Sequence, residues 1–536
     1  MQKRHFAAMT STLTTAAMTA AGMLAATAAL AQPAAPAVEV SDAAGHALSP
    51  RVSDMGTFQA PGIQQKREKP LRLIPVAPGQ EQPDPVVQTN AGPYVSTTTP
   101  IGYAGVGNGD YGFTPNAAPP DTNLAVGATQ VVQWVNESFA VFDKSTGGLL
   151  KGPVAGNTLF AALGGGCATN NDGDIIAQYD KIAARWVLTQ FSVSTTPYLQ
   201  CVAVSTTGDA TGSYNLYAFS YGTGFNDYPK LAVWPDAYYV TFNIFTDGRT
   251  FAGAKLCAYD RSKMLTGGAA TQQCFQLSTS YGGVLPADLD GVANLPTTGA
   301  PEPFVNFGSN SLNVWRFRVN WTTPSSTTLS GPINVPVAAF TPACGGGTCI
   351  PQPGTSNQLD SLADRVMYRF AYRAKTLASA SESAVLNHTV KVSGSKRHEV
   401  DGIRWYQLGN LTSGTPTVIQ QGTFSPDSNS RWMGSIAADK AGNLALGYSE
   451  SSSTLYPSIY YTGRLASDPT GTLQSEGRLK VGSGSQTGTL HRWGDYSSMT
   501  VDPSNDCTFF YTTEYLKATG SFNWSTWISS FSFPGC

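Results

Sequence analysis

Aspartates recur at even intervals in this chain. Asp121, Asp174 and Asp227 each open a segment that runs into an apolar strand, an Asp or Gly turn and a second apolar or aromatic strand, and successive members lie 53 residues apart (121 to 174, 174 to 227). If a repeated fold brings these carboxylates together, each raises the pKa of its neighbours, while nearby arginines lower it. Carboxylates whose pKa values are separated in this way suit general acid and general base chemistry.

Two of the recurring aspartates precede a tyrosine. The pairs are Asp227-Tyr228 and Asp495-Tyr496, and His491 stands shortly before the second pair. A tyrosine beside a carboxylate can act as a nucleophile or a base. We therefore predict Asp227 and Asp495 as the acid and base of a glycan hydrolase, with Tyr228 or Tyr496 as nucleophile. Elimination at a uronic acid would instead use Tyr496 or His491 as the base.

Basic and aromatic residues near the repeat openings predict a sugar-binding surface. Arginine can hold a carboxylate through two parallel hydrogen bonds, and a tryptophan can stack on a sugar ring. The predicted substrate-binding residues are Asp121, Lys230, Arg365, Arg431, Trp432, Arg492 and Trp493. The competing interpretation is structural, because such aspartates also bond turn amides or pair with an arginine of the next repeat. The tryptophans would then belong to the core.

An oxygen-rich stretch at residues 170–174 contains Asp172 and Asp174. Calcium prefers such carboxylate and amide oxygens, although the stretch lacks the twelve-residue loop that ends in a glutamate. We predict Asp172 and Asp174 as metal ligands, with calcium or another hard cation on the carboxylates of the repeat openings. An Asx turn is the alternative for this stretch.

Repeated strand–turn–strand units must position these residues. The units start near residues 121, 174, 227, 290, 365, 432 and 495, the fourth at Asp288 or Asp290. Repeats of roughly 50–70 residues built from short strands predict a β-propeller, in which radial repetition protects the sheet edges. We predict an all-β propeller with seven blades, with six or eight as neighbouring counts and a two-sheet sandwich as the alternative. The first strand of each blade lines the centre, so the unit openings would meet at one mouth.

Composition and the N-terminus predict an exported protein. The net charge is -2, which gives no electrostatic footprint for nucleic acid. Residues 1–31 combine a basic start with an Ala/Thr/Leu-rich run that ends in Ala29-Leu30-Ala31, as in a cleaved secretory signal peptide, and no membrane span follows. We expect a secreted or periplasmic protein. A largely irregular Pro/Ala-rich lead-in at 32–113, with room for short strands, would precede the propeller at 114–536. Its basic patch at residues 66–72 is interpreted as a solvated or processing segment.

Eight cysteines predict four disulfides in an exported chain. The nearest-neighbour scheme pairs Cys167 with Cys201, Cys257 with Cys274, Cys344 with Cys349, and Cys507 with Cys536. The sequence leaves other connectivities open. A zinc site is the competing interpretation, and the lack of any Cys-x-x-Cys argues against it.

Several phrases of the chain carry a family resemblance. They are Pro119-Pro-Asp121-Thr, Phe225-Asn-Asp-Tyr-Pro-Lys230, Arg365-Val-Met-Tyr-Arg369, Arg431-Trp-Met-Gly-Ser435 and Arg492-Trp-Gly-Asp-Tyr496. In these phrases, residues 114–536 resemble a group of exported bacterial β-propeller proteins that are often described as sialidase-like. The resemblance implies the propeller fold, and the group has no settled activity.

The wider sialidase-type superfamily carries Asp boxes, and residues 207–214 look like one with an extra residue before the glycine. The box is a turn device, so it supports the fold. Sialidases also need an arginine triad, for which the resemblance implies Arg365, Arg431 and Arg492. The repeated Asp boxes of that superfamily are missing from this chain, which argues against sialic-acid hydrolysis specifically.

The leading prediction is a carbohydrate-active enzyme, a glycoside hydrolase or a uronate-type lyase, that acts at the mouth of the central channel on an extracellular glycan, which can be anionic. The alternative is a non-catalytic propeller that binds a glycan, a peptide, a cation or a cell-surface ligand. Carboxylates at enzyme-like spacing favour the enzyme. Aspartates that are all occupied by turn amides and arginines favour the alternative.

Overall fold

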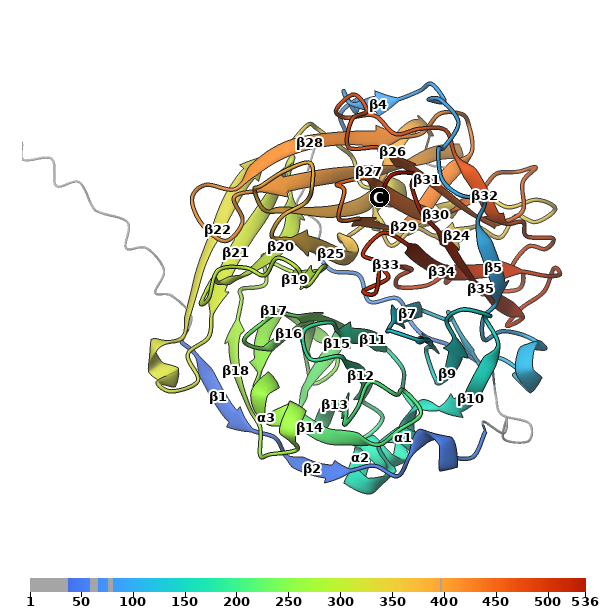
Figure 1. Cartoon of the computed structure of the whole chain (residues 1–536). Helices are drawn as coiled ribbons and strands as arrows, with labels where there is room; N and C mark the ends of the chain where they lie inside the picture. Colours follow the sequence, from blue (N-terminus) through green and yellow to red (C-terminus); the bar gives the residue numbers. More distant parts are fainter. Residues whose placement is uncertain (1–36, 58–65, 76–80, 396–397) are drawn as a thin grey trace, which may run out of the picture. The chain divides into compact units, whose positions relative to one another are not determined.

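The computed structural model describes residues 37–57, 66–75, 81–395 and 398–536. The predicted signal peptide at 1–31 lies outside these residues. Within them the regular structure is almost entirely β, and the short α-helices are α1 (Gly156–Leu159), α2 (Gly165–Thr169) and α3 (Arg261–Thr266). Figure 1 shows antiparallel sheets that follow one another around a common centre.

In each set of strands that lie next to one another in the sequence, the chain starts at the centre and moves outward through consecutive antiparallel strands. The first sheet contains β7 (Thr122–Val126), β8 (Gln130–Val135), β9 (Ser138–Asp143) and β10 (Leu149–Ala155). The second contains β11 (Ile176–Asp180), β12 (Arg185–Ser192), β13 (Tyr198–Ser205) and β14 (Tyr214–Gly222). The third contains β15 (Gly224–Val233), β16 (Tyr238–Thr246), β17 (Thr250–Tyr259) and β18 (Thr271–Gln276).

The next two strand sets merge. They are β19 (Leu285–Leu289), β20 (Glu302–Gly308), β21 (Ser311–Arg318) and β22 (Thr328–Pro336), then β25 (Met367–Arg373), β26 (Ser383–Ser395), β27 (His398–Gly409) and β28 (Thr417–Phe424). Because β19 and β25 pair in parallel, both sets join one nine-stranded sheet with β4 (Val87–Gln88). A two-stranded sheet of β23 (Thr348–Ile350) and β24 (Leu359–Asp360) lies between the sets in the sequence.

Two further sheets complete the order. One contains β29 (Ser430–Ala438), β30 (Leu444–Ser451), β31 (Ser458–Arg464) and β32 (Gly477–Lys480). The other contains β33 (Ser498–Val501), β34 (Phe509–Leu516) and β35 (Trp524–Phe531). The innermost strands β7, β11, β15, β19, β25, β29 and β33 contact one another in chain order, and β33 contacts β7 again. The predicted all-β propeller is therefore confirmed. Its blade count stays a prediction, since it depends on how the merged sheet is divided.

The inner strands are buried on both faces, which explains their sequences. All nine residues of β29, Ser-Arg-Trp-Met-Gly-Ser-Ile-Ala-Ala, are buried, and so are all residues of β7, β11 and β33. A strand covered on both faces needs no alternation of apolar and polar residues. Polar side chains on these strands must find partners inside the protein, because an unpaired buried polar group is costly.

The segment before the propeller supplies edge strands. Its strands β1 (Glu39–Asp42), β2 (Gly45–Leu48), β4 and β5 (Ile101–Ala104) pair with β18, β14, β28 and β35, respectively. Through β5, an N-terminal strand completes the last sheet of the chain. A further short strand, β3 (Arg67–Glu68), pairs in parallel with β6 (Ala117–Ala118). These additions cover backbone groups that an outer strand would otherwise expose.

All four predicted disulfides are confirmed, in the nearest-neighbour scheme: Cys167–Cys201, Cys257–Cys274, Cys344–Cys349 and Cys507–Cys536. Four disulfides fit an extracellular or periplasmic location, where thiols are oxidised. Across the described ranges, no helix has both the length and the apolar character needed to cross a membrane.

Two details of the predicted repeat are corrected or refined. The unit start predicted near residue 290 is wrong, because Asp288 lies near the end of inner strand β19 and Asp290 follows it. Residues 207–213 lie in the turn between β13 and β14, and Tyr214 begins β14, as expected for a turn device. There Asp209 Oδ1 accepts hydrogen bonds from the Thr211 amide (2.9 Å) and hydroxyl (2.8 Å).

Candidate functional site

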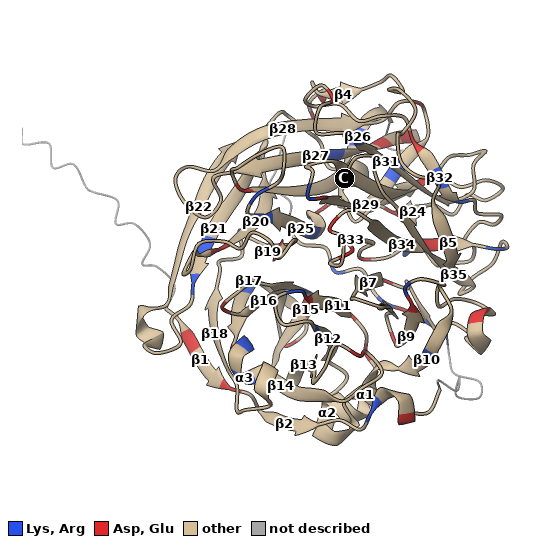
Figure 2. Ribbon diagram, viewed as in Figure 1, with Lys and Arg blue, Asp and Glu red and all other residues tan. Residues whose placement is uncertain are grey.

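Three repeat-opening aspartates meet at the entry to the inner strands. Carboxylate oxygens of Asp121, Asp174 and Asp495 all lie within 4.8 Å of one another, although the residues precede three different strands, β7, β11 and β33. Asp227 and Lys230 of β15 lie close enough to Asp174 for its negative charge to raise the pKa of both side chains. We call these five residues the inner cluster. Figure 2 shows that charged residues of both signs occur on the strands around the centre.

The backbone at these openings is left-handed. Asp121 and Asp174 have φ values of 44° and 45°, and the equivalent residue of the third unit is Tyr228 at 56°. Asp227, which the regular spacing aligned with the other two, therefore occupies the position before the equivalent one. A register shift between Asp227 and Lys230 accommodates this change. Aspartate is among the residues that tolerate positive φ best, which suits Asp121 and Asp174 to these turns.

Asn136 bridges the first two aspartates. Its Nδ2 donates to Asp121 Oδ2 (2.9 Å), and its Oδ1 accepts from the Asp174 amide (3.3 Å). Asp121 Oδ1 accepts from the Asp495 amide (2.7 Å), so both of its oxygens are occupied. Asp174 Oδ2 accepts from the Tyr228 amide (3.2 Å), whereas no hydrogen bond to its Oδ1 occurs in the described part of the chain. Asp174 is thus the more available of the two carboxylates.

Lys230 is fully buried beside the carboxylates. Its Nζ lies 3.4 Å from the ring centre of Tyr228 and 4.1 Å from that of Tyr496, and it donates to the Pro229 carbonyl at 2.8 Å. No carboxylate of the described residues lies within ion-pair distance of this nitrogen. Two aromatic faces and one carbonyl are a poor substitute for water around an ammonium ion. This amine can therefore lose its proton near neutral pH.

Burial shifts three ionisable groups toward neutral pH. It raises the pKa of Asp121 to about 8 and that of Asp227 to about 7, in both cases with a further contribution from the negative charge of Asp174. It lowers the pKa of Lys230 to about 7, helped by Arg365 and opposed by Asp174 and Asp121. Groups that titrate near neutral pH next to one another are a feature of acid/base sites, and structural networks can produce it too.

The two tyrosines pack over the lysine. Tyr228 donates to the Asp495 carbonyl (3.3 Å) and Tyr496 donates to the Ile175 carbonyl (2.5 Å). Burial raises the pKa of both hydroxyls well above the ordinary value of 10. Neither phenol is positioned to ionise, so their geometry supports positioning Lys230 more than acting as nucleophile or base.

Two arginines flank the inner cluster, and both have carboxylate partners. Arg365 Nε and Nη2 donate to Asp364 at 2.7 and 3.0 Å, and its guanidinium lies 4.4 Å from the ring centre of Tyr228. Arg492 Nε donates to Asp360 Oδ2 (2.7 Å), and its Nη2 pairs with Asp495. Both side chains are nearly fully buried.

The predicted arginine triad is not assembled. Arg431 pairs instead with Asp427 (2.9 Å), Glu450 (3.3 Å) and Glu476 (2.7 Å), a set that shares no member with the partners of Arg365 or Arg492. The Arg431 side chain therefore stabilises the sheet to which it belongs. Its three acidic partners come from the β28–β29 turn, from β30 and from the segment before β32.

Four further predicted site residues have other roles in the structure. Trp432 and Trp493 are fully buried and pack on each other with ring centres 5.8 Å apart, so they are core residues and cannot stack on a sugar. His491 is exposed, and its Nδ1 lies 2.9 Å from the Gln358 carbonyl. Asp172 accepts from the amides of Val193 (2.6 Å) and Ser194 (2.8 Å), which is a turn role. The metal prediction for Asp172 therefore has no geometric support.

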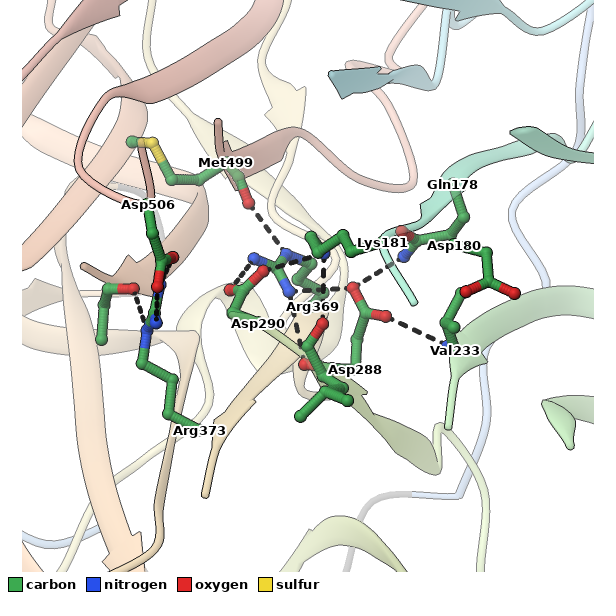
Figure 3. A network of polar contacts seen from close by, with 12 residues as sticks. Gln178, Asp180, Lys181, Val233, Asp288, Asp290, Arg369, Arg373, Met499 and Asp506 are labelled. Atoms are coloured by element: carbon green, nitrogen blue, oxygen red, sulfur yellow. Dashed lines mark hydrogen bonds and ion pairs between the residues drawn. The ribbon is translucent and has the colours of Figure 1, made fainter. Parts of the chain in front are cut away.

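Asp288 and Asp290 belong to a separate network, shown in Figure 3. Arg369 Nη1 donates to Asp288 Oδ2 (2.8 Å), its Nη2 pairs with Asp290, and its Nε donates to the Met499 carbonyl (3.0 Å). Lys181 also pairs with Asp290, at 3.0 Å. Arg369 of β25 thus connects β19 with β33. Asp288 and Asp290 therefore have the structural role that is the alternative to catalysis for the repeat aspartates.

Sequence reasoning missed the residues that lie over the inner cluster. Residues 67–75, here called the strap, contribute Lys69 and Arg72, whose charges lower the pKa values of Asp121 and Asp227, respectively. Lys69 also pairs with Glu137 at 3.1 Å. The sequence signal for these residues is the basic patch at 66–72, and its interpretation as a solvated or processing segment is wrong for Lys69, whose side chain is only 15% exposed. Glu514 of β34 was missed because nothing in its sequence surroundings marks it; burial raises its pKa well above the ordinary value.

No protein-family model and no curated protein matches the sequence. Among solved structures, the chain is similar to a subtype N10 neuraminidase-like protein of A/little yellow-shouldered bat/Guatemala/060/2010, at 9% identity and a TM-score of 0.32 over 66% of this chain and 98% of that one. The WD40 domain of coronin from Toxoplasma gondii has 9% identity and a TM-score of 0.37, over 83% of this chain and 89% of that one. A protein of unknown function from Dyadobacter fermentans has 9% identity and a TM-score of 0.36, over 82% and 100%. Similarity at this level carries no argument about activity.

Proposed function

We propose that the protein is a glycan-acting hydrolase in which the inner cluster provides general acid and general base. The observation that carries the proposal is the group of Asp174, Asp227 and Lys230: three ionisable side chains side by side, with pKa values of about 7 for Asp227 and Lys230. Asp227 would hold a proton near neutral pH and donate it to the leaving oxygen. Asp174, with one oxygen free of hydrogen bonds to described residues, would act as nucleophile or base.

The available bases decide between hydrolysis and elimination. Elimination receives less support, because His491 is bonded elsewhere and the pKa of Tyr496 is raised.

An uncharged glycan is the substrate that we propose, in place of an anionic one. Every arginine that was predicted to hold an anion already has a carboxylate partner. A cavity of about 340 Å³ next to Asp364 is lined mainly by amides, hydroxyls and aromatic rings. Amides hydrogen-bond sugar hydroxyls, and rings pack on sugar faces. The amides and rings are those of Asn306, Asn313, Asn334, Tyr281 and Phe307.

The test is an activity screen of the mature protein on neutral and anionic polysaccharides, read by released reducing ends and by unsaturated-uronate absorbance. Asp227→Asn and Asp174→Asn should each lower hydrolysis by about 100-fold or more, because each removes one proton-transfer group. Asp209→Asn, in the β13–β14 turn, should leave the rate unchanged. Equal rates for the wild type and both site variants on every substrate would end the enzyme proposal.

A second candidate function, cation binding, is favoured by the three carboxylates within 4.8 Å. Their oxygens are of the type that calcium binds, but Lys230 lies beside them and competes for the same negative charge. Calorimetric titration of chelator-treated protein with calcium tests this candidate. Binding that Asp174→Asn abolishes would support it, and the absence of heat in the wild type would exclude it.

A further inference from the structure

The strap is held by the groups that flank the inner cluster. Arg492 Nη1 donates to the Lys69 carbonyl (2.9 Å), and Arg365 Nη2 donates to the Arg72 carbonyl (2.8 Å). Farther along, the Ile74 amide donates to Asp364 Oδ2 (3.0 Å). Two arginines that a substrate could have used thus bind backbone carbonyls of the protein's own chain.

The Arg72 side chain lies over two aromatic rings, one from β15 and one from β16. Its guanidinium lies 4.2 Å from the ring centre of Phe225 and 5.4 Å from that of Phe245, and Nη1 donates to the Gly248 carbonyl (2.7 Å). These rings, with Phe191, form a small cluster separate from the main cores. A planar cation between aromatic faces and a carbonyl is a recognised mode of ligand binding.

The mode of attachment distinguishes the strap from the other N-terminal segments. Strands β1, β2, β4 and β5 each extend a sheet of the propeller through backbone pairing. The strap pairs through its backbone at β3, whose partner β6 belongs to none of the blade sheets. Its remaining contacts to the propeller are side chains that bond its backbone, and those of Lys69 and Arg72. Its departure would break the β3–β6 pairing but would open no blade.

We propose that the strap is an intramolecular peptide ligand that keeps the inner cluster closed, and that its displacement opens the site. Asp121 and Asp174 are only 1% and 6% exposed with the strap in place, so a glycan reaches them only in the fraction of molecules whose strap has detached. The surface beneath recognises an extended segment with an ammonium group next to Glu137 and a guanidinium group over Phe225. The proposal rests on the proposed function only for what the opened site then does.

The test compares Arg72→Ala with Leu73→Ala in the full chain, by hydrogen–deuterium exchange and mass spectrometry. Leu73 is the matched control because it is the next residue and its side chain is 54% exposed. Arg72→Ala should raise exchange about tenfold in peptides that cover 121–126, 174–180 and 492–501, because the cation–π and carbonyl contacts are lost. Exchange in β30 and β31 should stay as in the wild type.

A synthetic peptide of residues 66–75, added to the Arg72→Ala protein, should restore slow exchange in the same segments. The same peptide with alanine at position 72 should not. Unchanged exchange in Arg72→Ala, or a rise of equal size in β30 and β31, would overturn the proposal. These readouts need no substrate: local opening without hydrolysis would sink the enzyme proposal alone, whereas hydrolysis that Arg72→Ala leaves unchanged would sink the strap proposal alone.

Discussion

At the scale of single residues, the inner cluster makes stability depend on pH. Burial raises the pKa of Asp121 from 3.8 to about 8, so the folded protein keeps a proton that the unfolded chain releases between about pH 4 and pH 8. Asp227 acts with the same sign up to about pH 7. The free energy of unfolding should therefore fall as the pH rises through this window. Lys230 acts with the opposite sign. Because its pKa is lowered to about 7, the free energy of unfolding rises with pH above about pH 7, where only the unfolded chain still holds that proton.

Asp121→Asn tests this linkage. Asparagine accepts the left-handed backbone at this position and cannot ionise. The loss of unfolding free energy between pH 5 and pH 7, measured by urea denaturation, should become smaller by about 2.5 kcal/mol, since each pH unit in this window is worth about 1.4 kcal/mol. Asp143→Asn is the control: hydrogen bonds from Ser145 and Thr146 lower the pKa of Asp143 to about 2, so it does not titrate in this range. A slope for Asp121→Asn equal to that of the wild type would contradict the assignment.

Gly173 shows how tightly the loop before β11 packs against Asn136. The glycine has a φ of 94°, and an added Cβ would lie 1.6 Å from Asn136 Oδ1. Gly109 has a similar φ of 77° but no atom within 4 Å of such a Cβ. Gly109→Ala should cost about 1 kcal/mol of unfolding free energy from backbone strain alone, and Gly173→Ala at least about 2 kcal/mol more. Equal losses in urea denaturation would show that the Asn136 bridge is loose.

At the scale of elements, the sequence predicted the strand units well where the chain carries long apolar runs. Residues 174–191 and 227–243 have such runs and form β11–β12 and β15–β16. Strands β1 and β2 have the sequences EVSD and GHAL, which carry neither alternation nor β-branched runs, so their pairing with β18 and β14 could not be foreseen. The site was predicted at Asp121, Asp174 and Asp227 through spacing. The sequence did not predict a role for Lys69 and Arg72 at the site, because that role depends on contacts between parts of the chain more than 100 residues apart.

The terminal disulfide fixes the last element to its own sheet. Cys507 lies in the turn between β33 and β34, and Cys536 ends the chain after β35, 29 residues later. In the chain-entropy account, closing a loop of this length stabilises by about 3–4 kcal/mol, against about 2 kcal/mol for a five-residue loop. Cys507→Ser/Cys536→Ser should therefore lower the free energy of unfolding more than Cys344→Ser/Cys349→Ser does. Urea denaturation of both double variants measures the difference, and the reverse order would contradict this account.

At the scale of the whole molecule, each inner strand contacts the inner strands before and after it, and side-chain contacts help to hold this ring together. Arg369 connects β25 with β19 and β33 (Figure 3). Arg373, four residues later, donates to the Ala438 carbonyl of β29 (2.6 Å) and pairs with Asp506 in the β33–β34 turn. Two side chains of β25 therefore connect elements that precede and follow it in the sequence. Since β25 already pairs with β19 through the backbone, the contacts of Arg369 and Arg373 add links from β25 to β33 and β29.

Arg369→Met measures the contribution of this network. Methionine keeps most of the side-chain volume but leaves Asp288 and Asp290 buried without their cation. We expect a loss of about 3–5 kcal/mol in the free energy of unfolding, the size found when one member of a buried ion pair is removed. Burial opposes the ionisation of Asp290, and Arg369, Lys181 and Arg373 together hold its pKa below the ordinary value, so the variant should bind an extra proton at this site. Its loss of stability should accordingly be smaller at pH 5 than at pH 8.

Lys517→Met is the control, because Lys517 pairs with Asp110 at the surface and its side chain is 41% exposed. An exposed pair contributes about 0–1 kcal/mol. Similar losses in the two variants would show that the ring does not depend on Arg369.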